Sequence, residues 1–163
     1  MAHIHELYDF TVSAFIMHPF EAKILLLKHK KIGKWLQPGG HIELNEDPLQ
    51  ALTHELIEET GLLPSDYEII EPADHPMPTG NSTALPTPFY VFVHNYNAQH
   101  KHIDLSYTLK ANTDVLTQNP DGAEAIGWFS IAEITQKHAE GSLFIDTLQI
   151  CQWLAQKYFM DTV

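Results

Sequence analysis

Residues 38–62, PGGHIELNEDPLQALTHELIEETGL, decide how this chain folds. The two adjacent glycines predict a turn, since glycine accepts backbone conformations that other residues avoid. Asp47-Pro48 predicts the start of a helix, because aspartate caps the free N–H groups and proline suits the first helical position. Gly61 predicts its end. We therefore expect a helix over residues 47–60. An apolar stripe at helical spacing would pack it against the core, and it consists of Leu49, Leu52 and Leu56.

Three carboxylates share another face of this helix. Glu55, Glu58 and Glu59 lie at i, i+3 and i+4, where each like-charged pair costs roughly 0.2–0.5 kcal/mol on an exposed helix. No lysine lies within the helix to relieve them. A cation bound by oxygen ligands would turn the repulsion into attraction, and Mg²⁺ suits this role. A solvated acidic face is the alternative. The upstream Gly-Gly turn favours the metal site, since it lets a bare backbone carbonyl approach the same ion.

The stretch resembles the Nudix hydrolase signature, G-x5-E-x7-R-E-U-x-E-E-x-G-U, in which U is aliphatic. From Gly40 to Leu62 every fixed position matches except one, where His54 stands in place of arginine. The resemblance implies an α/β (α+β) fold, a Nudix-type α/β/α sandwich with a mixed central sheet. It also implies a set of ligands for Mg²⁺ or Mn²⁺, namely the Gly39 carbonyl, Glu55, Glu58 and Glu59.

The same resemblance implies hydrolysis of a nucleoside diphosphate linked to another moiety. A carboxylate must then accept a proton from water. The family implies either a motif glutamate, here Glu55 or Glu58, or one in the loop before the last strand. Glu124 occupies that loop, with Asp121 as a competitor, and a solvated turn residue is the alternative interpretation. Glu46 would support the loop or the metal waters.

His54 changes one supporting contact. The family's arginine would orient a motif glutamate, and such supporting residues matter about 10–100-fold in metal affinity or activity. Histidine is shorter and mostly neutral at pH 7. It could still donate one hydrogen bond, so we expect a retained but altered site.

Composition limits the partners. The chain has 163 residues, 44% of them hydrophobic, which suits one domain over residues 1–163. Its net charge of −12 argues against nucleic acid and anionic membranes as main partners. All nine basic residues are lysines, so phosphate recognition must use metal, Lys, His or backbone N–H groups. We expect a small-molecule nucleotide or nucleotide-sugar diphosphate as partner, and a homodimer stays an open alternative.

Location follows from what the sequence lacks. The single cysteine, Cys151, excludes an internal disulfide and fits a reducing compartment. No basic region followed by an apolar run begins the sequence, and no stretch has about 18 consecutive apolar residues. We therefore expect a cytoplasmic protein.

Candidate substrate contacts cluster before the metal loop. Five of the nine lysines lie within residues 23–34, and Lys28 or Lys34 would attract phosphates unless the group is a solvated strand end. Trp35 could stack on a base or sugar, although strand aromatics are more often core. His41 could contact a phosphate or lie in solvent. His100 and His102, at i and i+2, would share one face of a strand, but no third metal ligand is evident.

The remaining pattern predicts a mixed sheet. We expect strands at 8–17, 23–29, 35–37, 67–71, 89–96, 103–110 and 125–129, and a turn at 119–122. Residues 72–88 hold five prolines and predict a long loop of the kind that carries specificity. We expect a helix at 131–139 and another within 143–159. The second helix would have one apolar face, made of Leu143, Phe144, Leu148, Cys151 and Leu154.

The substrate and the activity stay open in the sequence. ADP-ribose hydrolases of this family carry a proline 15–16 residues past the signature, and Pro78 lies 16 past Leu62. This favours nucleoside diphosphate sugars, with diadenosine polyphosphates and nucleoside triphosphates as alternatives. A Nudix-fold nucleotide-binding or sensor domain is the second hypothesis. A diphosphate isomerase of the same fold is the third, but it requires an active-site cysteine, and Cys151 falls in the C-terminal helix.

Overall fold

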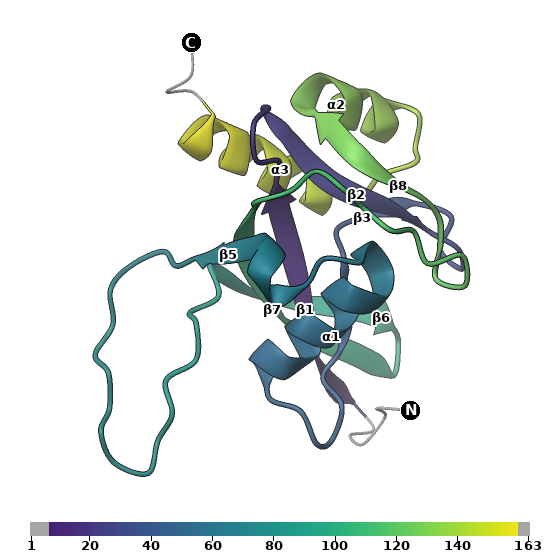
Figure 1. Ribbon diagram of the computed structural model, residues 1–163. Coiled ribbons are helices and arrows are strands. Elements are labelled where there is room, and N and C mark those ends of the chain that lie inside the picture. The colour runs from purple at the N-terminus through teal and green to yellow at the C-terminus, as the bar shows by residue number, and fades with distance from the viewer. Residues whose placement is uncertain (1–6, 160–163) are drawn as a thin grey trace.

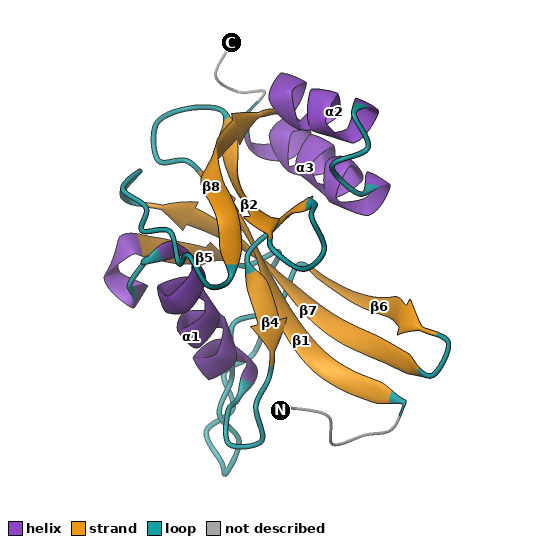
Figure 2. Ribbon diagram, turned by 90° about the vertical axis from the view of Figure 1, so that its right-hand side faces the viewer, coloured by secondary structure: helices purple, strands orange, loops and turns teal. Residues whose placement is uncertain are grey.

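The computed structural model describes residues 7–159 and shows a mixed sheet between two layers of helices. Helix α1 (Pro48–Thr60) packs on one face of the sheet. Helices α2 (Ile131–Ala139) and α3 (Ile145–Tyr158) pack on the other face (Figure 2). The predicted α/β/α sandwich is therefore confirmed.

The sheet has one central parallel pair, β1 with β7, and its other strand pairs are antiparallel. The strands are β1 (Tyr8–Met17), β2 (Lys23–His29), β3 (Trp35–Leu36), β4 (Gly39–His41), β5 (Tyr67–Ile70), β6 (Tyr90–Asn97), β7 (His100–Ala111) and β8 (Ala123–Ser130). Their order is β3-β2-β1-β7-β5, with β4 paired to β1, β6 to β7 and β8 to β2. A short 3₁₀ turn at Pro64–Asp66 precedes β5.

Alternation along β1 divides the core into two halves. Val12 and Ile16 face α1, where they pack in one cluster with Leu52 and Leu56. Phe15 points the other way, into a cluster under α2 and α3. That cluster contains Ile24, Leu26, Ile134, Leu143, Leu148, Cys151 and Leu154. The position of α1 on the sheet is thus set by Leu52 and Leu56 of the predicted apolar stripe, whereas its third member, Leu49, is only partly buried and lies outside this cluster.

Several predicted boundaries need correction. The Gly-Gly turn is in fact strand β4, because residues 39–41 pair with β1. Strand β7 begins at His100 rather than at residue 103, and β8 begins at Ala123 rather than at 125. Phe144 does not belong to the apolar face of α3. It occupies the N-cap position in an extended conformation, which leaves it 44% exposed.

The proline-rich stretch forms a long loop between β5 and β6, as expected, and contains no helix or strand (Figure 1). Glu71 joins its two ends, because its carboxylate accepts a 2.8 Å hydrogen bond from the Thr87 N–H. Within residues 7–159, no helix is long and apolar enough to cross a membrane.

Candidate active site

Helix α1 is fixed at both ends, which sets the direction of its glutamates. Asp47 accepts a 2.9 Å hydrogen bond from the Gln50 N–H, while the Gln50 side chain accepts one from the Asp47 N–H. Gly61 ends the helix with φ of 76°, and its N–H donates to the Ile57 carbonyl. Both predicted caps are confirmed.

Two of the three glutamates meet strand β4. The Glu59 carboxylate accepts a 2.9 Å hydrogen bond from the Gly39 N–H. The Glu55 carboxylate lies against Gly40, where an added Cβ would be only 2.1 Å from Glu55 Oε1. At Gly39 an added Cβ would be 2.2 Å from the Val12 carbonyl oxygen, and its φ of 154° also favours glycine. Gly39 is therefore required by the close approach of backbone, whereas a side chain at Gly40 would displace the Glu55 carboxylate.

Glu58 is placed differently, through His54. Its side chain is 59% exposed, and Glu58 Oε1 lies 3.0 Å from His54 Nε2. His54 Nδ1 lies 3.0 Å from Glu46 Oε1 on the preceding loop. The imidazole thus contacts two carboxylates, one more than the sequence suggested. The hydrogen bond to Glu58, with the charges of nearby carboxylates, raises the pKa of His54 and favours the imidazolium.

Glu55 and Glu59, which are both partly buried, have unusual pKa values. Burial raises the pKa of Glu55 to about 7, and neighbouring carboxylates add to the shift. Burial likewise raises the pKa of Glu59 to about 7, although the hydrogen bond from Gly39 opposes it. A cation beside them would favour both ionised forms. The donors are carboxylate oxygens next to a glycine backbone, a set that suits Mg²⁺ or Mn²⁺.

The two lysines predicted to bind phosphate, Lys28 and Lys34, have other partners in the structure. Glu124 belongs to strand β8, not to the preceding loop as expected, because β8 starts two residues earlier. Its carboxylate lies 2.8 Å from Lys28 Nζ on the paired strand β2. Lys34 donates a 2.6 Å hydrogen bond to the Gly141 carbonyl. Among the described residues, these two lysines are thus seen engaged with Glu124 and Gly141 rather than with the motif glutamates.

Trp35 is partly buried and packs against the core cluster under α2 and α3. Its ring meets Phe129 edge to face at 4.8 Å between centroids, and Lys137 Nζ lies 4.1 Å from the ring centroid. These neighbours belong to β8 and α2. The indole is therefore a packing residue in this structure, and its predicted contact with a base stays a prediction.

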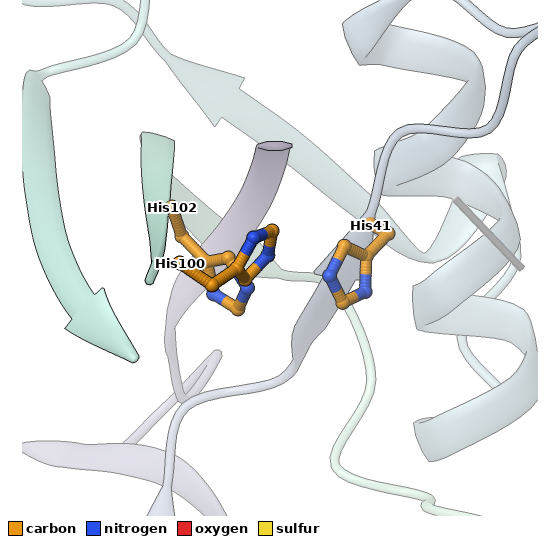
Figure 3. Close-up of side chains that lie close together, drawn as sticks. All are labelled: His41, His100 and His102. Carbon is orange, nitrogen blue, oxygen red and sulfur yellow. The ribbon is translucent and has the colours of Figure 1, made fainter. Parts of the chain in front are cut away.

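His41 joins a group that sequence reasoning missed. Its ring centroid lies 4.9 Å from that of His102, and the two rings together with His100 form a compact group (Figure 3). The i, i+2 pair was visible in the sequence, but its third member is 59 positions upstream and arrives only through strand pairing. Burial, followed by the charges of His41 and His100, lowers the pKa of His102. We call these three residues the histidine cluster.

Cys151 is fully buried in the core cluster under α2 and α3. Burial raises the pKa of its thiol to about 12. A buried and protonated thiol is a poor nucleophile or acid–base group at neutral pH. This placement agrees with its interpretation as a core residue and speaks against isomerase chemistry.

The fold and the glutamate site define a class of protein with a carboxylate cluster on a helix that is sandwiched against a mixed sheet. Comparison with protein families gives the same class, since the NUDIX domain model matches residues 8–148. The chain belongs to the NUDIX family. Hydrolases of this family generally use divalent metals. A comparison with curated protein sequences found no match.

Solved structures agree with this assignment. A NUDIX-family hydrolase from Clostridium perfringens is 28% identical, with a TM-score of 0.74 over 88% of this chain and 93% of that one. A C. elegans Ap4A hydrolase in a binary complex is 15% identical, with a TM-score of 0.69 over 91% and 96%. The NUDIX domain of Shewanella oneidensis NrtR, complexed with ADP ribose, is 19% identical, with a TM-score of 0.66 over 94% and 90%.

The two glycines of β4 should respond differently to alanine. We expect Gly39→Ala to lower the free energy of unfolding by about 2 kcal/mol, because its Cβ meets backbone and its φ is strained. Gly40→Ala should cost less stability, since the obstructing atoms end the flexible Glu55 side chain. It should nevertheless weaken Mn²⁺ binding by displacing that carboxylate. Urea unfolding and Mn²⁺ titration measure both effects, and equal stability losses would contradict this account.

The metal-free protein should lose stability as pH rises from about 4.5 to about 7. Glu55 and Glu59 have folded-state pKa values above the ordinary 4.5, so the folded state binds more protons in this window. The destabilisation is absent below about 4.5 and complete above about 7. We expect the melting temperature to fall by roughly 3 °C or more in chelator, given about 2–4 °C per kcal/mol at this size.

The matched control is the double variant Glu55→Gln, Glu59→Gln, which keeps the shape of both side chains and removes the titration. Its melting temperature should fall much less over the same pH range. Added Mg²⁺ should restore the melting temperature of the wild type at the high-pH end and should not change that of the double variant. If the melting temperature of the wild type fell with pH no more steeply than that of the variant, the raised pKa values of Glu55 and Glu59 would be contradicted.

Proposed function

We propose that the chain is a divalent-metal-dependent Nudix pyrophosphohydrolase. Its reaction would be hydrolysis of the phosphoric anhydride within a nucleoside diphosphate linked to another moiety. The supporting observation is the placement of Glu55 and Glu59 against the Gly39-Gly40 strand. Two partly buried carboxylates beside bare backbone cost stability unless a cation offsets their charge. Family membership gives that cation a catalytic context.

We assign the metal to four proposed ligands: the Gly39 carbonyl, Glu55, Glu58 and Glu59. A bound Mg²⁺ or Mn²⁺ would neutralise diphosphate oxygens and make water more acidic. Glu55 is the proposed proton acceptor, because its carboxylate lies at the contact between α1 and β4. His54 orients Glu58 and Glu46 through its two ring nitrogens, the part that arginine plays in the family signature.

A second set of residues would act on the substrate. Glu124 is the alternative proton acceptor, and its carboxylate lies 2.8 Å from the Lys28 ammonium. Lys28, on β2, is the proposed phosphate contact. Lys34 and Trp35 are weaker proposals, since both are engaged with α2 and its following turn. His41 has the other two members of the histidine cluster, His100 and His102, as its neighbours, which favours a different role for it.

For the substrate we propose a nucleoside diphosphate sugar such as ADP-ribose. The NrtR domain that shares this fold is complexed with ADP ribose, and Pro78 lies at the expected distance from the signature. A cavity of about 540 Å³ lies between β6 and α3, on the face of the sheet opposite α1 and therefore apart from the glutamates. Phe89 and Trp153 stack at its wall, 5.5 Å apart and at 14°. Diadenosine polyphosphates are the next candidate, given the similar Ap4A hydrolase.

One observation favours a second function, nucleotide binding without hydrolysis. His54 holds Glu58 at 3.0 Å on an exposed side of α1, whereas Glu55 and Glu59 turn to β4. If the substrate and metal do not recruit Glu58, the site would hold a cation and a diphosphate without turnover. Binding and hydrolysis of the same compound distinguish the two functions.

Hydrolysis should require Mg²⁺ or Mn²⁺ in a screen of ADP-ribose, a diadenosine polyphosphate and nucleoside triphosphates. We expect Glu55→Gln to lower kcat by about 10²–10⁴, the usual contribution of a positioned acid–base group. Glu68→Gln, at an exposed position of β5, is the matched control and should leave kcat unchanged. A comparable loss of kcat in Glu124→Gln would instead identify Glu124, on β8, as the proton acceptor. ADP-ribose binding with no turnover by any metal would instead support the binding function.

Arginine should substitute for His54. We expect His54→Arg to preserve or raise Mg²⁺-dependent turnover, because guanidinium can donate to Glu46 and Glu58 together. His54→Ala should lower metal affinity or activity about 10–100-fold, the usual cost of losing a residue that orients ligands. Steady-state kinetics against Mg²⁺ concentration measures both. A large loss in His54→Arg would show that the imidazole has a role of its own.

A further inference from the structure

The histidine cluster brings three imidazoles together from two strands. His41 ends β4, while His100 and His102 lie near the start of β7 (Figure 3). One ring nitrogen from each residue can be chosen such that all three lie within 4.8 Å of one another. Asp9 on β1 is beside them, with Oδ2 3.2 Å from His100 Nε2 and 3.9 Å from His41 Nε2.

Strand pairing explains why these side chains converge. β1 pairs antiparallel with β4, where Thr11 is the register partner of His41. It pairs parallel with β7, where Asp9 is the register partner of His102. Alternate residues of a strand point to the same face. Gly40 faces Glu55 and α1, so His41 points to the opposite face of the sheet. The cluster is therefore separated by the sheet from the glutamate site, although both use β4.

The strands beneath the cluster are tightly joined. Asp104 on β7 is buried and accepts hydrogen bonds from three hydroxyl groups. Thr11 donates at 2.7 Å and Ser106 at 2.6 Å, and Ser13 donates as well. Because Thr11 and Ser13 belong to β1, this network fixes β1 against β7. The ligand-bearing backbone is thus held in place before any ion binds.

The rings are held by one another and by an aromatic neighbour. His102 meets His41 and His100 edge to face, at 83° in each case and at 4.9 and 5.1 Å between centroids. Tyr96 on β6 stacks against His102 at 5.2 Å. A set of side chains held in this way loses little conformational freedom when it binds a ligand.

The donor set selects the ion. Three imidazoles and a carboxylate suit Zn²⁺ and its neighbours among the transition metals, whereas Mg²⁺ prefers oxygen ligands. Tetrahedral Zn²⁺ with Zn–N distances of 2.0–2.1 Å places ligand nitrogens roughly 3.4 Å apart. Small ring rotations would therefore bring the nitrogens from within 4.8 Å to ligand distance. Asp9, only 2% exposed, supplies negative charge that a cation would offset.

We propose that His41, His100 and His102, with Asp9 beside them, form a site for a divalent transition-metal ion of the Zn²⁺ type. This site is additional to the oxygen-rich site of the glutamates. Strand β4 thereby serves two ions of different chemistry, with the Gly39 carbonyl at the oxygen site and His41 at the nitrogen site. The proposal does not depend on the hydrolase activity.

Zn²⁺ binding to the full chain, stripped with chelator and then kept in excess Mg²⁺, tests the proposal. Competition with a chromophoric chelator should show one Zn²⁺ per chain in the wild type and in Glu55→Gln, Glu59→Gln. We expect His102→Ala to weaken binding by at least about 100-fold, the upper end for loss of a residue that supports a metal. Co²⁺ should give the visible absorption of a tetrahedral site in the wild type and lose it in His102→Ala.

Three controls make the result specific. His75→Ala removes a histidine of the long loop, far from the cluster in sequence, and should bind Zn²⁺ as the wild type does. His102→Gln keeps a polar side chain in case the alanine variant does not fold, and melting in chelator checks the fold of each variant. His3 and His5 lie outside the described residues, so a variant with both changed to alanine tests whether they bind the ion.

The expected result is Zn²⁺ binding that survives the loss of His3, His5 or His75 and is lost with His41, His100 or His102. The proposal is overturned if the triple variant His41→Ala, His100→Ala, His102→Ala binds Zn²⁺ as tightly as the wild type. It is also overturned if the wild type binds no Zn²⁺ in excess Mg²⁺, or if only the loss of His3 and His5 removes binding.

Discussion

The contact between strand β4 and helix α1 is the interaction on which the rest of the site depends. Glu59 accepts the Gly39 N–H, and the Glu55 carboxylate occupies the space in which Gly40 would carry a side chain. Packing of Leu52 and Leu56 against β1 sets the distance between helix and sheet. Core packing therefore partly buries the two carboxylates, and this desolvation raises their pKa, a shift that a cation would reverse.

The absence of arginine shapes the rest of the electrostatics. The sequence contains nine lysines and 21 acidic residues, and His54 stands at the position of the signature arginine. The imidazole contacts both Glu46 on the loop and Glu58 on the helix. It therefore keeps the connection between loop and helix with an imidazole in place of a guanidinium. Its charge depends on pH, whereas a guanidinium would stay charged. Glu58 consequently differs from Glu55 and Glu59 in exposure and partner.

Local sequence predicted the elements well, because the relevant forces act over a few residues. Asp47 and Gly61 cap α1 as expected, and β1, β2 and α2 have the expected bounds. The glycines of β4 were expected to form a turn, since nothing local shows that β1 would pair with them. Glu124 was placed in a loop for the same reason, because its strand is extended by pairing with β2.

The same limit applies to side-chain groups assembled from distant strands. His100 and His102 were visible as a pair, but His41 joins them only because β4 and β7 both pair with β1. Signature spacing found the glutamates because one helix carries all three. The contact of His54 with Glu58 is local, since the two residues lie at i and i+4 on α1, whereas its contact with Glu46 depends on how the preceding loop folds against the helix.

Diffraction from crystals soaked in Mn²⁺, collected for its anomalous signal, tests the central claim most directly. The account predicts an anomalous peak between α1 and β4, within coordinating distance of the Glu55 and Glu59 carboxylates. A peak confined to other parts of the molecule, with these two carboxylates still turned to Gly39 and Gly40, would contradict it.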